Sequence, residues 1–179
     1  GRLLEAYVLS MVSAFAEDEH VLIYGASTEI SGDFAPGAWW TNNATDAMIR
    51  ALTNDCSTVV MNKEGEYIVN PTVSESVEGV MNEDGTKTYT IKIKDGLVYN
   101  NGEAITIEDF VWATAFGCSA VASEVGCKLT SYLTVEGGQA YRDGEASVIS
   151  GLRILDDKTM SIQIVASKVP YYYDITYAA

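Results

Sequence analysis

The sequence predicts a mixed α/β fold of the α+β kind, in which hairpin-paired strands form a mixed sheet beside two or three short helices. Three observations support this prediction. The chain has 179 residues, about the size of one domain. Hydrophobic residues make up 47% of it, which is within the ~45–50% of an ordinary globular chain and enough to form a core. Short strand-like runs alternate with turn residues, and most are next to their partner in sequence, unlike a regular series of βαβ units.

The first elements are a strand, a loop and a helix. Residues 21–24 form a short apolar run that Gly25 ends, and this pattern predicts a buried strand. The loop over residues 27–40 is rich in Ser, Thr, Gly and Pro. Thr and Asn at positions 41–43 offer N-cap chemistry, and residues 46–52 have the composition of a helix.

Two hairpins follow, over residues 58–69 and 73–95. In the second hairpin an Asn-Glu-Asp-Gly turn separates the two strands. After that turn the sequence alternates, with Tyr89, Ile91 and Ile93 on one face and Thr and Lys on the other. This alternation predicts a half-buried antiparallel strand.

A second helix and a third hairpin complete the predicted elements. Thr106 is placed to cap a helix, and Asp109 follows three residues later, where a carboxylate complements the helix N-terminus. Apolar residues then recur at helical spacing from Ile107. Residues 117–137 are expected to be irregular, and residues 149–165 are expected to form two strands around an Asp-Asp-Lys turn.

The overall charge and hydropathy argue against three classes of protein. The formal net charge is −14, so the surface would repel phosphate, and nucleic acid is not an expected partner. No stretch reaches the ~18 consecutive apolar residues of a spanning helix, which argues against a polytopic membrane protein. The apolar and aromatic content argues against intrinsic disorder.

The motifs of the common enzyme classes are also missing. The sequence contains no P-loop, dinucleotide-binding fingerprint or nucleophile elbow. It has one histidine, His20, which disfavours a Ser-His-Asp triad, a Cys/His zinc site and direct metal ligation. A hydrolase that uses a pair of carboxylates stays open as an alternative, although most adjacent acids lie in predicted turns. We therefore expect no enzyme activity, no cofactor and no metal.

The cysteines and the N-terminus each allow two interpretations. Cys118 and Cys127 either close a short disulfide loop, if the protein is exported, or are two free thiols. Cys56 would be left as an odd, buried thiol. Residues 1–19 read either as the remnant of a signal peptide or as an N-terminal helix, and the rest of the chain, residues 20–179, reads as one domain.

Trp39 and Trp40 form an unusual pair in the loop between the predicted first strand and first helix. Loops at such strand ends are where open α/β sheets bind ligands. The alternative is that one of the two indoles packs in the core as a lid.

Four segments, in order, resemble a known family. Residues 84–111 resemble the signature of the family 5 extracellular solute-binding proteins, which are the oligopeptide-, dipeptide- and nickel-binding components of ABC importers. Residues 25–52, 138–159 and 169–173 resemble further segments of that family. In the signature, Asn101 stands where the family usually has Asp, and Ala104 where it usually has Pro. Both departures fall in a structural turn.

The resemblance implies the N-terminal lobe of a type II periplasmic-binding-protein-like fold, incomplete relative to the family. It implies an extracytoplasmic protein (secreted, periplasmic or lipid-anchored at the outer face of the cell membrane) that captures peptides between two lobes and delivers them to an ABC transporter permease. Closure would be a hinge motion that shifts the population to the closed form. A lobe without its partner is also expected to expose an apolar face and to form a homodimer. A sugar or nickel-chelate ligand, and a structural or adhesive surface module, remain the other interpretations.

The resemblance also implies which residues of this lobe contact the ligand. By ungapped match from Gly25, the ligand-binding segment falls on Gly37, Ala38 and Trp39, with Trp40 and Thr41 adjoining. On the same loop, Glu29, Ser31 and Asp33 are candidates to meet a peptide amine, with an exposed turn as the alternative. Tyr132, in the irregular segment, is a further candidate.

Overall fold

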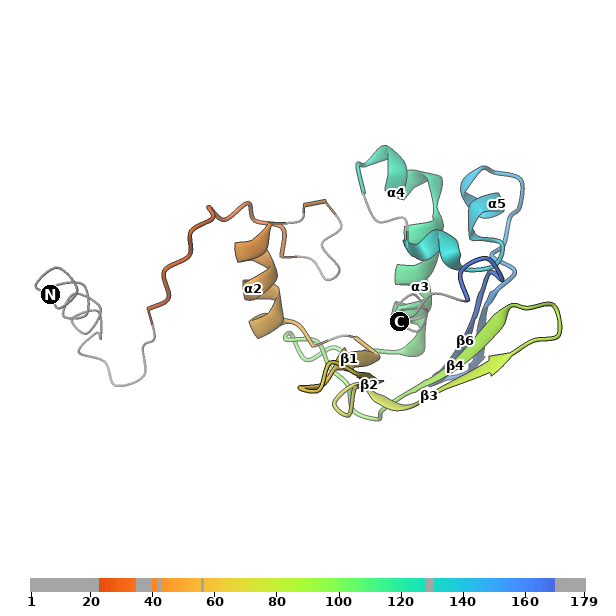
Figure 1. The fold of residues 1–179 in the computed structure, drawn as a ribbon, viewed down its shortest axis with the longest axis horizontal. Coiled ribbons are helices and arrows are strands. Elements are labelled where there is room, and N and C mark those ends of the chain that lie inside the picture. The colour runs from red at the N-terminus through yellow and green to blue at the C-terminus, as the bar shows by residue number, and fades with distance from the viewer. Residues whose placement is uncertain (1–22, 35–39, 42, 56, 128–130, 170–179) are drawn as a thin grey trace, which may run out of the picture.

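The structure, a computed structural model, describes residues 23–34, 40–41, 43–55, 57–127 and 131–169. Its helices are α2 (Ala44–Thr53), α3 (Ile107–Cys118), α4 (Ala120–Glu124), the 3-10 helix η1 (Ser131–Thr134) and α5 (Gly138–Arg142). Its strands are β1 (Val59–Met61), β2 (Tyr67–Val69), β3 (Ser74–Met81), β4 (Lys87–Ile93), β5 (Leu152–Asp156) and β6 (Thr159–Ile164). Helices α2 and α5 lie toward opposite ends of this body, with the β1–β2 hairpin beside α2 (Figure 1).

The strands form two sheets. Strands β1 and β2 pair with each other, and the larger sheet has the order β3-β4-β6-β5. The three predicted hairpins are therefore confirmed. Every pair of these described strands is antiparallel, so the expected mixed sheet is wrong for this part of the chain. A hairpin connection makes its two strands antiparallel. Strands β4 and β6, which belong to different hairpins, also pair antiparallel.

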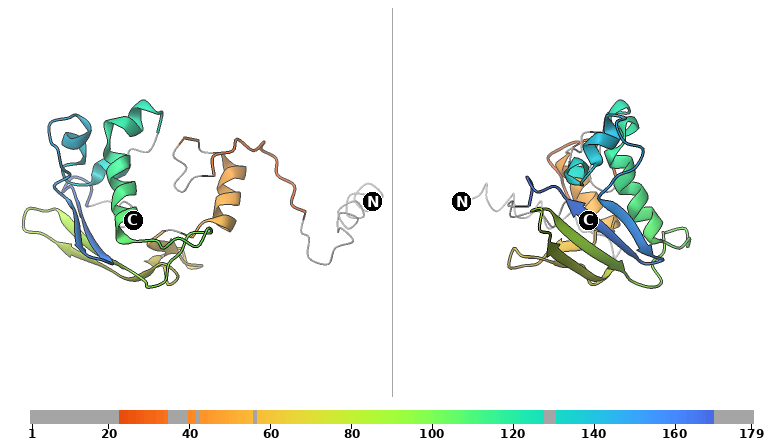
Figure 2. Two further views of the ribbon diagram at one scale, coloured as in Figure 1. Left: turned by 180° about the vertical axis from the view of Figure 1, so that it is seen from behind. Right: turned by 90° about the vertical axis from the view of Figure 1, so that its right-hand side faces the viewer.

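The core lies on one face of the larger sheet, where the two central strands place alternate side chains. Ile91 faces Met160 across the strands, and Tyr89 faces Ile162. All four are buried with Ile93 and Ile164, as the alternation of β4 predicts. Helix α3 covers this face and adds Ile107 and Cys118 to the same cluster (Figure 2).

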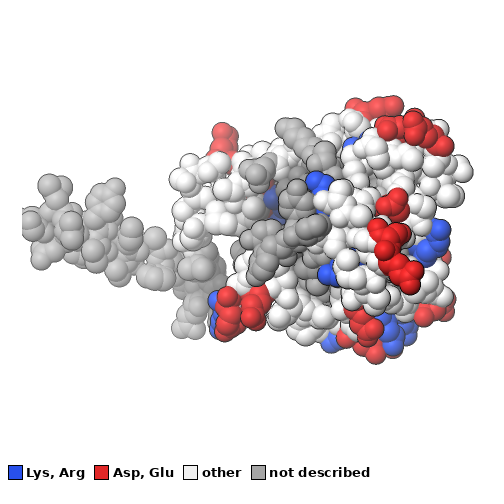
Figure 3. All heavy atoms as spheres, turned by 45° about the vertical axis from the view of Figure 1, so that its right-hand side comes forward, with Lys and Arg blue, Asp and Glu red and all other residues white. Residues whose placement is uncertain are grey.

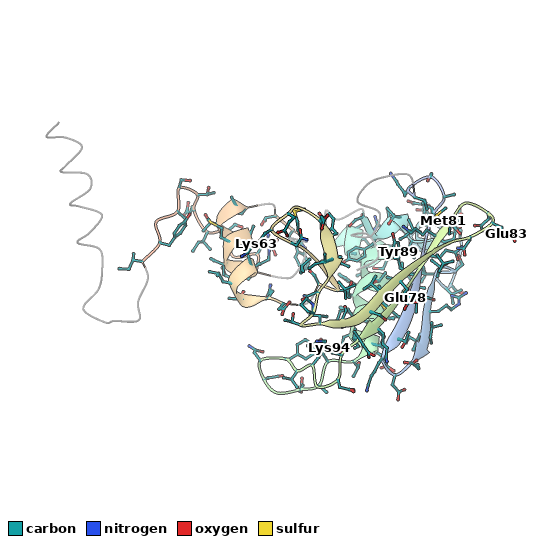
Figure 4. All side chains as sticks on the ribbon, turned by 60° about the horizontal axis from the view of Figure 1, so that its bottom comes forward. Lys63, Glu78, Met81, Glu83, Tyr89 and Lys94 are labelled. Atoms are coloured by element: carbon teal, nitrogen blue, oxygen red, sulfur yellow. The ribbon has the colours of Figure 1, made fainter. Side chains whose placement is uncertain are left out.

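The β3–β4 hairpin turns where the sequence predicts. Gly85 has a φ of 82°, a left-handed conformation that glycine adopts at little cost. Glu83 lies at the tip of the hairpin, and Lys94 lies at its other end (Figure 4). On the strands, Gly79 lies opposite Tyr89, and a side chain at position 79 would collide with the Tyr89 ring.

Helix α3 starts at its predicted cap but runs further than predicted. The Asp109 carboxylate accepts a hydrogen bond from the Thr106 backbone N–H at 2.7 Å, which confirms the start of the helix. The helix continues to Cys118, and Ser119 then caps α4 by accepting from the Ala122 N–H at 3.1 Å. The expectation that residues 117–137 are irregular is therefore wrong in part. Helices of one turn leave too few residues for a periodic pattern.

The predicted first strand is not formed in its described part. Ile23 and Tyr24 are 61% and 72% exposed and pair with no described strand. A strand requires a hydrogen-bonded neighbour, and its apolar side chains stay exposed when nothing packs on them. Val21 and Leu22 lie outside the described residues, as do residues 1–19, for which a helix or a signal remnant is predicted, and most of the 169–173 segment.

Cys118 and Cys127 are both free thiols, so the disulfide interpretation is wrong for this structure. The Cys118 thiol is buried and donates to the Tyr132 carbonyl oxygen at 3.2 Å. Burial raises the pKa of this thiol to about 11, and the positive charge of Arg142 lowers that pKa by a smaller amount. Cys56 lies outside the described residues.

Two further findings concern the surface and the helices. On the face shown in Figure 3, Asp and Glu side chains outnumber Lys and Arg side chains, as expected from the net charge of −14. Within the described ranges, no helix has the length and apolar character needed to cross a bilayer.

Candidate functional site

The loop before α2 is held on the first turn of that helix. Asn43 caps the helix, because its side-chain oxygen accepts from the backbone N–H groups of Thr45 at 2.9 Å and Asp46 at 3.1 Å. The Asn43 amide nitrogen donates to the Glu29 carbonyl oxygen at 2.7 Å. The Thr45 hydroxyl donates to the Thr28 carbonyl oxygen, also at 2.7 Å. The helix terminus therefore fixes residues 28 and 29.

Asp46, at the third position of α2, is fully buried and binds the next part of the loop. Its carboxylate accepts from the Ser31 N–H at 3.0 Å, the Ser31 hydroxyl at 2.5 Å and the Asp33 N–H at 3.0 Å. Burial alone would raise the pKa of this carboxyl group. The hydrogen bonds from Ser31 and from the backbone of Asp33 and Gly32 outweigh burial and hold the pKa below its ordinary value. Asp46 is therefore a charged anchor for the loop.

Asp33 extends the same arrangement to the end of the loop. Its carboxylate accepts from the Thr41 N–H at 2.8 Å, the Trp40 N–H at 3.2 Å and the Thr41 hydroxyl at 3.3 Å. Burial raises the pKa of Asp33, but these hydrogen bonds and the nearby Arg50 guanidinium lower it further, so that it lies below its ordinary value. Asp33 thus brings the two ends of segment 33–41 together.

Side chains of α2 and of its C-cap residue also bind the backbone where this segment begins. The Arg50 guanidinium donates to the Asp33 carbonyl oxygen at 2.5 Å. The Asn54 amide nitrogen donates to the Phe34 carbonyl oxygen at 3.1 Å. Helix α2 therefore binds the loop along its length, from residue 28 to residue 34.

Trp40 connects the loop to a distant part of the lobe. Its indole N–H donates to the Val125 carbonyl oxygen, at the C-terminal end of α4, at 3.1 Å. Trp40 as a whole is 38% exposed. Ser31 and Thr41 also approach each other, with their hydroxyl oxygens 3.2 Å apart. The loop is therefore attached both to α2 and to the α3–α4 region.

The structure brings together four of the residues predicted to bind ligand: Glu29, Ser31, Trp40 and Thr41 all lie on this loop, as does Asp33. Gly37, Ala38 and Trp39 lie outside the described residues. Tyr132 lies on η1 with its ring against Gly117 of α3. A role in ligand binding stays a prediction for all of these residues.

Sequence reasoning missed the residues that shape the loop. Asp46 was expected only as part of a helix, although an acid three residues after an Asn cap was a usable signal for a structured helix start. Asp33 was a candidate to meet a peptide amine, with an exposed turn as the alternative, and its carboxylate accepts three hydrogen bonds from within the loop. The contact between Trp40 and Val125 joins residues 85 positions apart, and no local pattern could have indicated it.

The described part of the chain offers no group of three or more His, Cys, Asp or Glu side chains that could hold a metal ion. Its carboxyl groups with a shifted pKa are Asp33, Asp46, Asp84, Asp95 and Asp156, and each has a lowered pKa. Four of these carboxylates accept hydrogen bonds from backbone N–H groups, and Asp95 pairs with the Lys158 ammonium group.

Comparison with known proteins finds similarity to peptide-binding proteins. The oligopeptide-binding protein OppA of Bacillus subtilis is 27% identical over 91 residues, which are 50% of this chain and 16% of that protein. A periplasmic oligopeptide-binding protein of Borrelia burgdorferi matches with a TM-score of 0.62 and 23% identity, over 81% of this chain and 28% of that chain. OppA of Haemophilus influenzae, solved with the peptide RPPGFSPFR, matches with a TM-score of 0.59 and 22% identity, over 79% of this chain and 26% of that chain. No family model matches the chain.

These similarities confirm the resemblance to the family 5 solute-binding proteins and the fold that it implies. The solved structures, at this level of identity, show the fold alone. The matched region spans 16% of the curated relative and about a quarter of each solved chain, as expected for the N-terminal portion of such a protein.

Proposed function

We propose that this chain is the N-terminal lobe of an extracytoplasmic solute-binding protein that captures peptides between two lobes and delivers them to the permease of an ABC importer. The premise is the resemblance to the family 5 proteins and the names of its relatives, which are oligopeptide-binding proteins. The ligand is a peptide of a few residues, and the partner is the membrane permease. The place of action is outside the cytoplasm.

One observation from the structure carries the proposal: the described residues on either side of the segment that the resemblance assigns to ligand binding are held in place by hydrogen bonds to α2 and to Asp33. Asp46 and Asp33 together accept six hydrogen bonds from residues 31, 33, 40 and 41. A peptide that is bound through its main chain requires fixed backbone donors and acceptors. Backbone that is already held by hydrogen bonds does not lose further conformational freedom when the ligand binds.

The same site supports binding rather than catalysis. A hydrolase with a carboxylate pair needs one carboxyl group with a raised pKa to act as general acid. Asp33 and Asp46, the two acids that the loop brings near each other, both have lowered pKa values and accept hydrogen bonds. The relatives are likewise binding proteins. We therefore propose that the protein binds and releases its ligand unchanged.

Apolar side chains on α2 support the expectation of a homodimer for this lobe alone. Leu52 is 89% exposed, and Met48 is also exposed on the same helix. Exposed apolar area of this kind favours association. Sedimentation equilibrium of the 179-residue chain tests it, with Leu52→Lys expected to shift the mass toward the monomer. A concentration-independent monomer for the unsubstituted chain would refute it.

Intrinsic tryptophan fluorescence of the natural protein that contains this sequence tests the proposed function. The protein is titrated with a mixed pool of di- to hexapeptides. A saturable change in emission is expected, and Trp39→Phe is expected to abolish it if that indole contacts the peptide. Trp112→Phe is the matched control, because Trp112 is 64% exposed on α3, stacks on Phe116 and is not among the residues predicted to bind ligand. No change in a folded protein would contradict peptide binding and direct the next titration to sugars and nickel chelates.

A further inference from the structure

We propose that Asn101 is a modification site, at which the side-chain amide is lost spontaneously and an acidic residue replaces it. Asn101 and Gly102 form the only Asn-Gly pair of the sequence. Both are exposed, in the turn between β4 and α3. Gly102 supplies the attacking nitrogen, and Glu103 holds the amide that leaves. The reaction does not depend on peptide binding.

Gly102 leaves the approach to Asn101 open. The backbone nitrogen that follows an asparagine reaches its Cγ when the chain bends back, and a side chain on the following residue hinders that bend. Gly102 has a φ of 87°, which glycine adopts at little cost. Outside the adjacent residues, no atom lies within 4 Å of the place where a Cβ would be. The Gly102 N–H donates to the Tyr99 carbonyl oxygen at 2.9 Å, and this bond breaks before the attack.

Glu103 contacts both ends of the Asn101 amide. Its backbone N–H donates to the Asn101 side-chain oxygen at 3.0 Å. Its carboxylate accepts from the Asn101 Nδ2, also at 3.0 Å. When the attack makes Cγ tetrahedral, negative charge develops on the side-chain oxygen, and a fixed N–H donor stabilises that charge. The carboxylate lies beside the leaving nitrogen, where it can pass on the proton that the Gly102 nitrogen loses.

The reaction needs water and no other reactant. A bond forms between the Gly102 nitrogen and the Asn101 Cγ, and the bond from Cγ to Nδ2 breaks. The amide leaves as ammonia, with the proton of the Gly102 N–H, and a succinimide ring remains. Water then opens the ring. Opening at Cγ gives aspartate, and opening at the main-chain carbonyl gives isoaspartate, in which the chain continues through the side chain.

Either product changes the charge and the contacts of the turn. Deamidation adds one negative charge to the formal net charge of −14. It also replaces the hydrogen bond from Asn101 to Glu103 by two carboxylates at close range. Isoaspartate lengthens the main chain at a turn that is closed by the bond from Gly102 to Tyr99 and by the bond from the Tyr99 N–H to the Glu103 carbonyl oxygen. Modified and unmodified protein are therefore expected to separate by anion-exchange chromatography.

The turn between β1 and β2 contains a matched control. The Asn62 side-chain oxygen accepts from the Glu64 N–H at 3.0 Å and the Glu66 N–H at 2.8 Å. The Asn62 Nδ2 donates to the Glu66 carboxylate at 3.2 Å. This amide is therefore held as that of Asn101 is, but the next residue is Lys63. We expect Asn62 to keep its amide, and Lys63→Gly to create a second site there.

The test incubates the natural protein that contains this sequence in a mildly alkaline buffer at body temperature. Peptide mapping by mass spectrometry measures the conversion of each asparagine. A synthetic peptide of residues 97–105 is incubated in parallel, and both are analysed when half of the peptide has converted. We expect Asn101 in the folded protein to convert at least as far, because the fold holds Glu103 against the amide and the peptide does not. Less conversion in the protein than in the peptide would overturn the proposal.

Two variants separate the contributions of the neighbouring residues. Glu103→Gln keeps the backbone N–H and an acceptor oxygen but removes the carboxylate, and it is expected to slow the conversion of Asn101 about tenfold. An unchanged rate would overturn the role of the carboxylate. Conversion of Asn62 as fast as Asn101 in the unsubstituted protein, or a stable Asn62 in Lys63→Gly, would overturn the role of the glycine. Urea denaturation checks that both variants are folded.

Discussion

Asp46 and Asn43 are single residues whose chemistry determines the shape of the candidate site. Asn43 caps α2 and Asp46 binds Ser31 and Asp33 from the same helix turn. Helix N-termini carry unpaired N–H groups and a partial positive charge. The N–H groups therefore donate hydrogen bonds to the oxygen atoms of amide and carboxylate side chains. Here the side chains of Asn43 and Asp46 also bind residues of the loop that lie 13 to 15 positions earlier in the chain.

The reactivity of Cys118 follows from its surroundings. Burial raises its pKa to about 11, so about a thousandth of the thiol is ionised at pH 8. We expect iodoacetamide to leave Cys118 unlabelled in the folded protein and to label the half-buried Cys127. Peptide mapping by mass spectrometry measures both. Recovery of a Cys118–Cys127 disulfide from the native protein would contradict the prediction.

Gly117 provides the space for the Tyr132 ring. A Cβ atom at position 117 would overlap that ring, so Gly117→Ala is expected to destabilise the fold by about 1–3 kcal/mol through overpacking. The general preference of helices for Ala over Gly would give the opposite sign. Gly25→Ala is the control, because nothing lies within 4 Å of its added Cβ. Urea denaturation measures both, and a Gly117→Ala variant as stable as the control would refute the packing.

At the scale of elements, the sequence predicted the hairpins and the long helices, because their patterns lie within short stretches of the chain. The three hairpins have their turn residues and alternation in one short stretch, and both long helices have a cap in sequence. Residues 23–24 were wrongly predicted as strand because pairing depends on another segment. Helix α4 was missed because a helix of five residues is too short to show a periodic pattern of apolar side chains. The loop–α2 network was missed because its bonds join residues that are 7 to 20 positions apart.

The pairing of β4 with β6 buries side chains whose shortening is expected to destabilise the core. Ile91 is fully buried opposite Met160, so Ile91→Ala is expected to cost about 2–5 kcal/mol of unfolding free energy. Val80→Ala is the matched control on the adjacent strand, where the side chain is exposed, and it is expected to cost less than about 1 kcal/mol. Equal midpoints in urea denaturation would show that the core does not lie on this face.

Acid is expected to release the loop from α2. Asp33 and Asp46 have folded pKa values below the ordinary 3.8. Their contribution to stability is therefore fully present above pH 3.8 and is lost as the pH falls through the lowered values. NMR signals of the Ser31, Asp33, Trp40 and Thr41 backbone amides, followed from about pH 6 to about pH 2, measure this release. A transition of these signals centred above 3.8 would contradict the lowered pKa values.

At the scale of the whole molecule, the chain matches one portion of the larger proteins that it resembles. It covers about a quarter of the solved oligopeptide-binding proteins that it matches, and its candidate loop lies between α2 and the end of α4. A site on one lobe can contribute only part of the ligand contacts when a second lobe closes over it. Weak or absent peptide affinity is therefore expected for the 179-residue chain alone, measured by isothermal titration calorimetry with the di- to hexapeptide pool.

Peptide capture by the natural protein is tested most directly by native mass spectrometry after incubation with the di- to hexapeptide pool and removal of unbound peptide. We predict that the protein carries added masses equal to those of peptides in the pool, at one peptide per protein. A folded protein that retains no peptide, while a sugar or a nickel chelate adds to its mass under the same conditions, would contradict peptide binding.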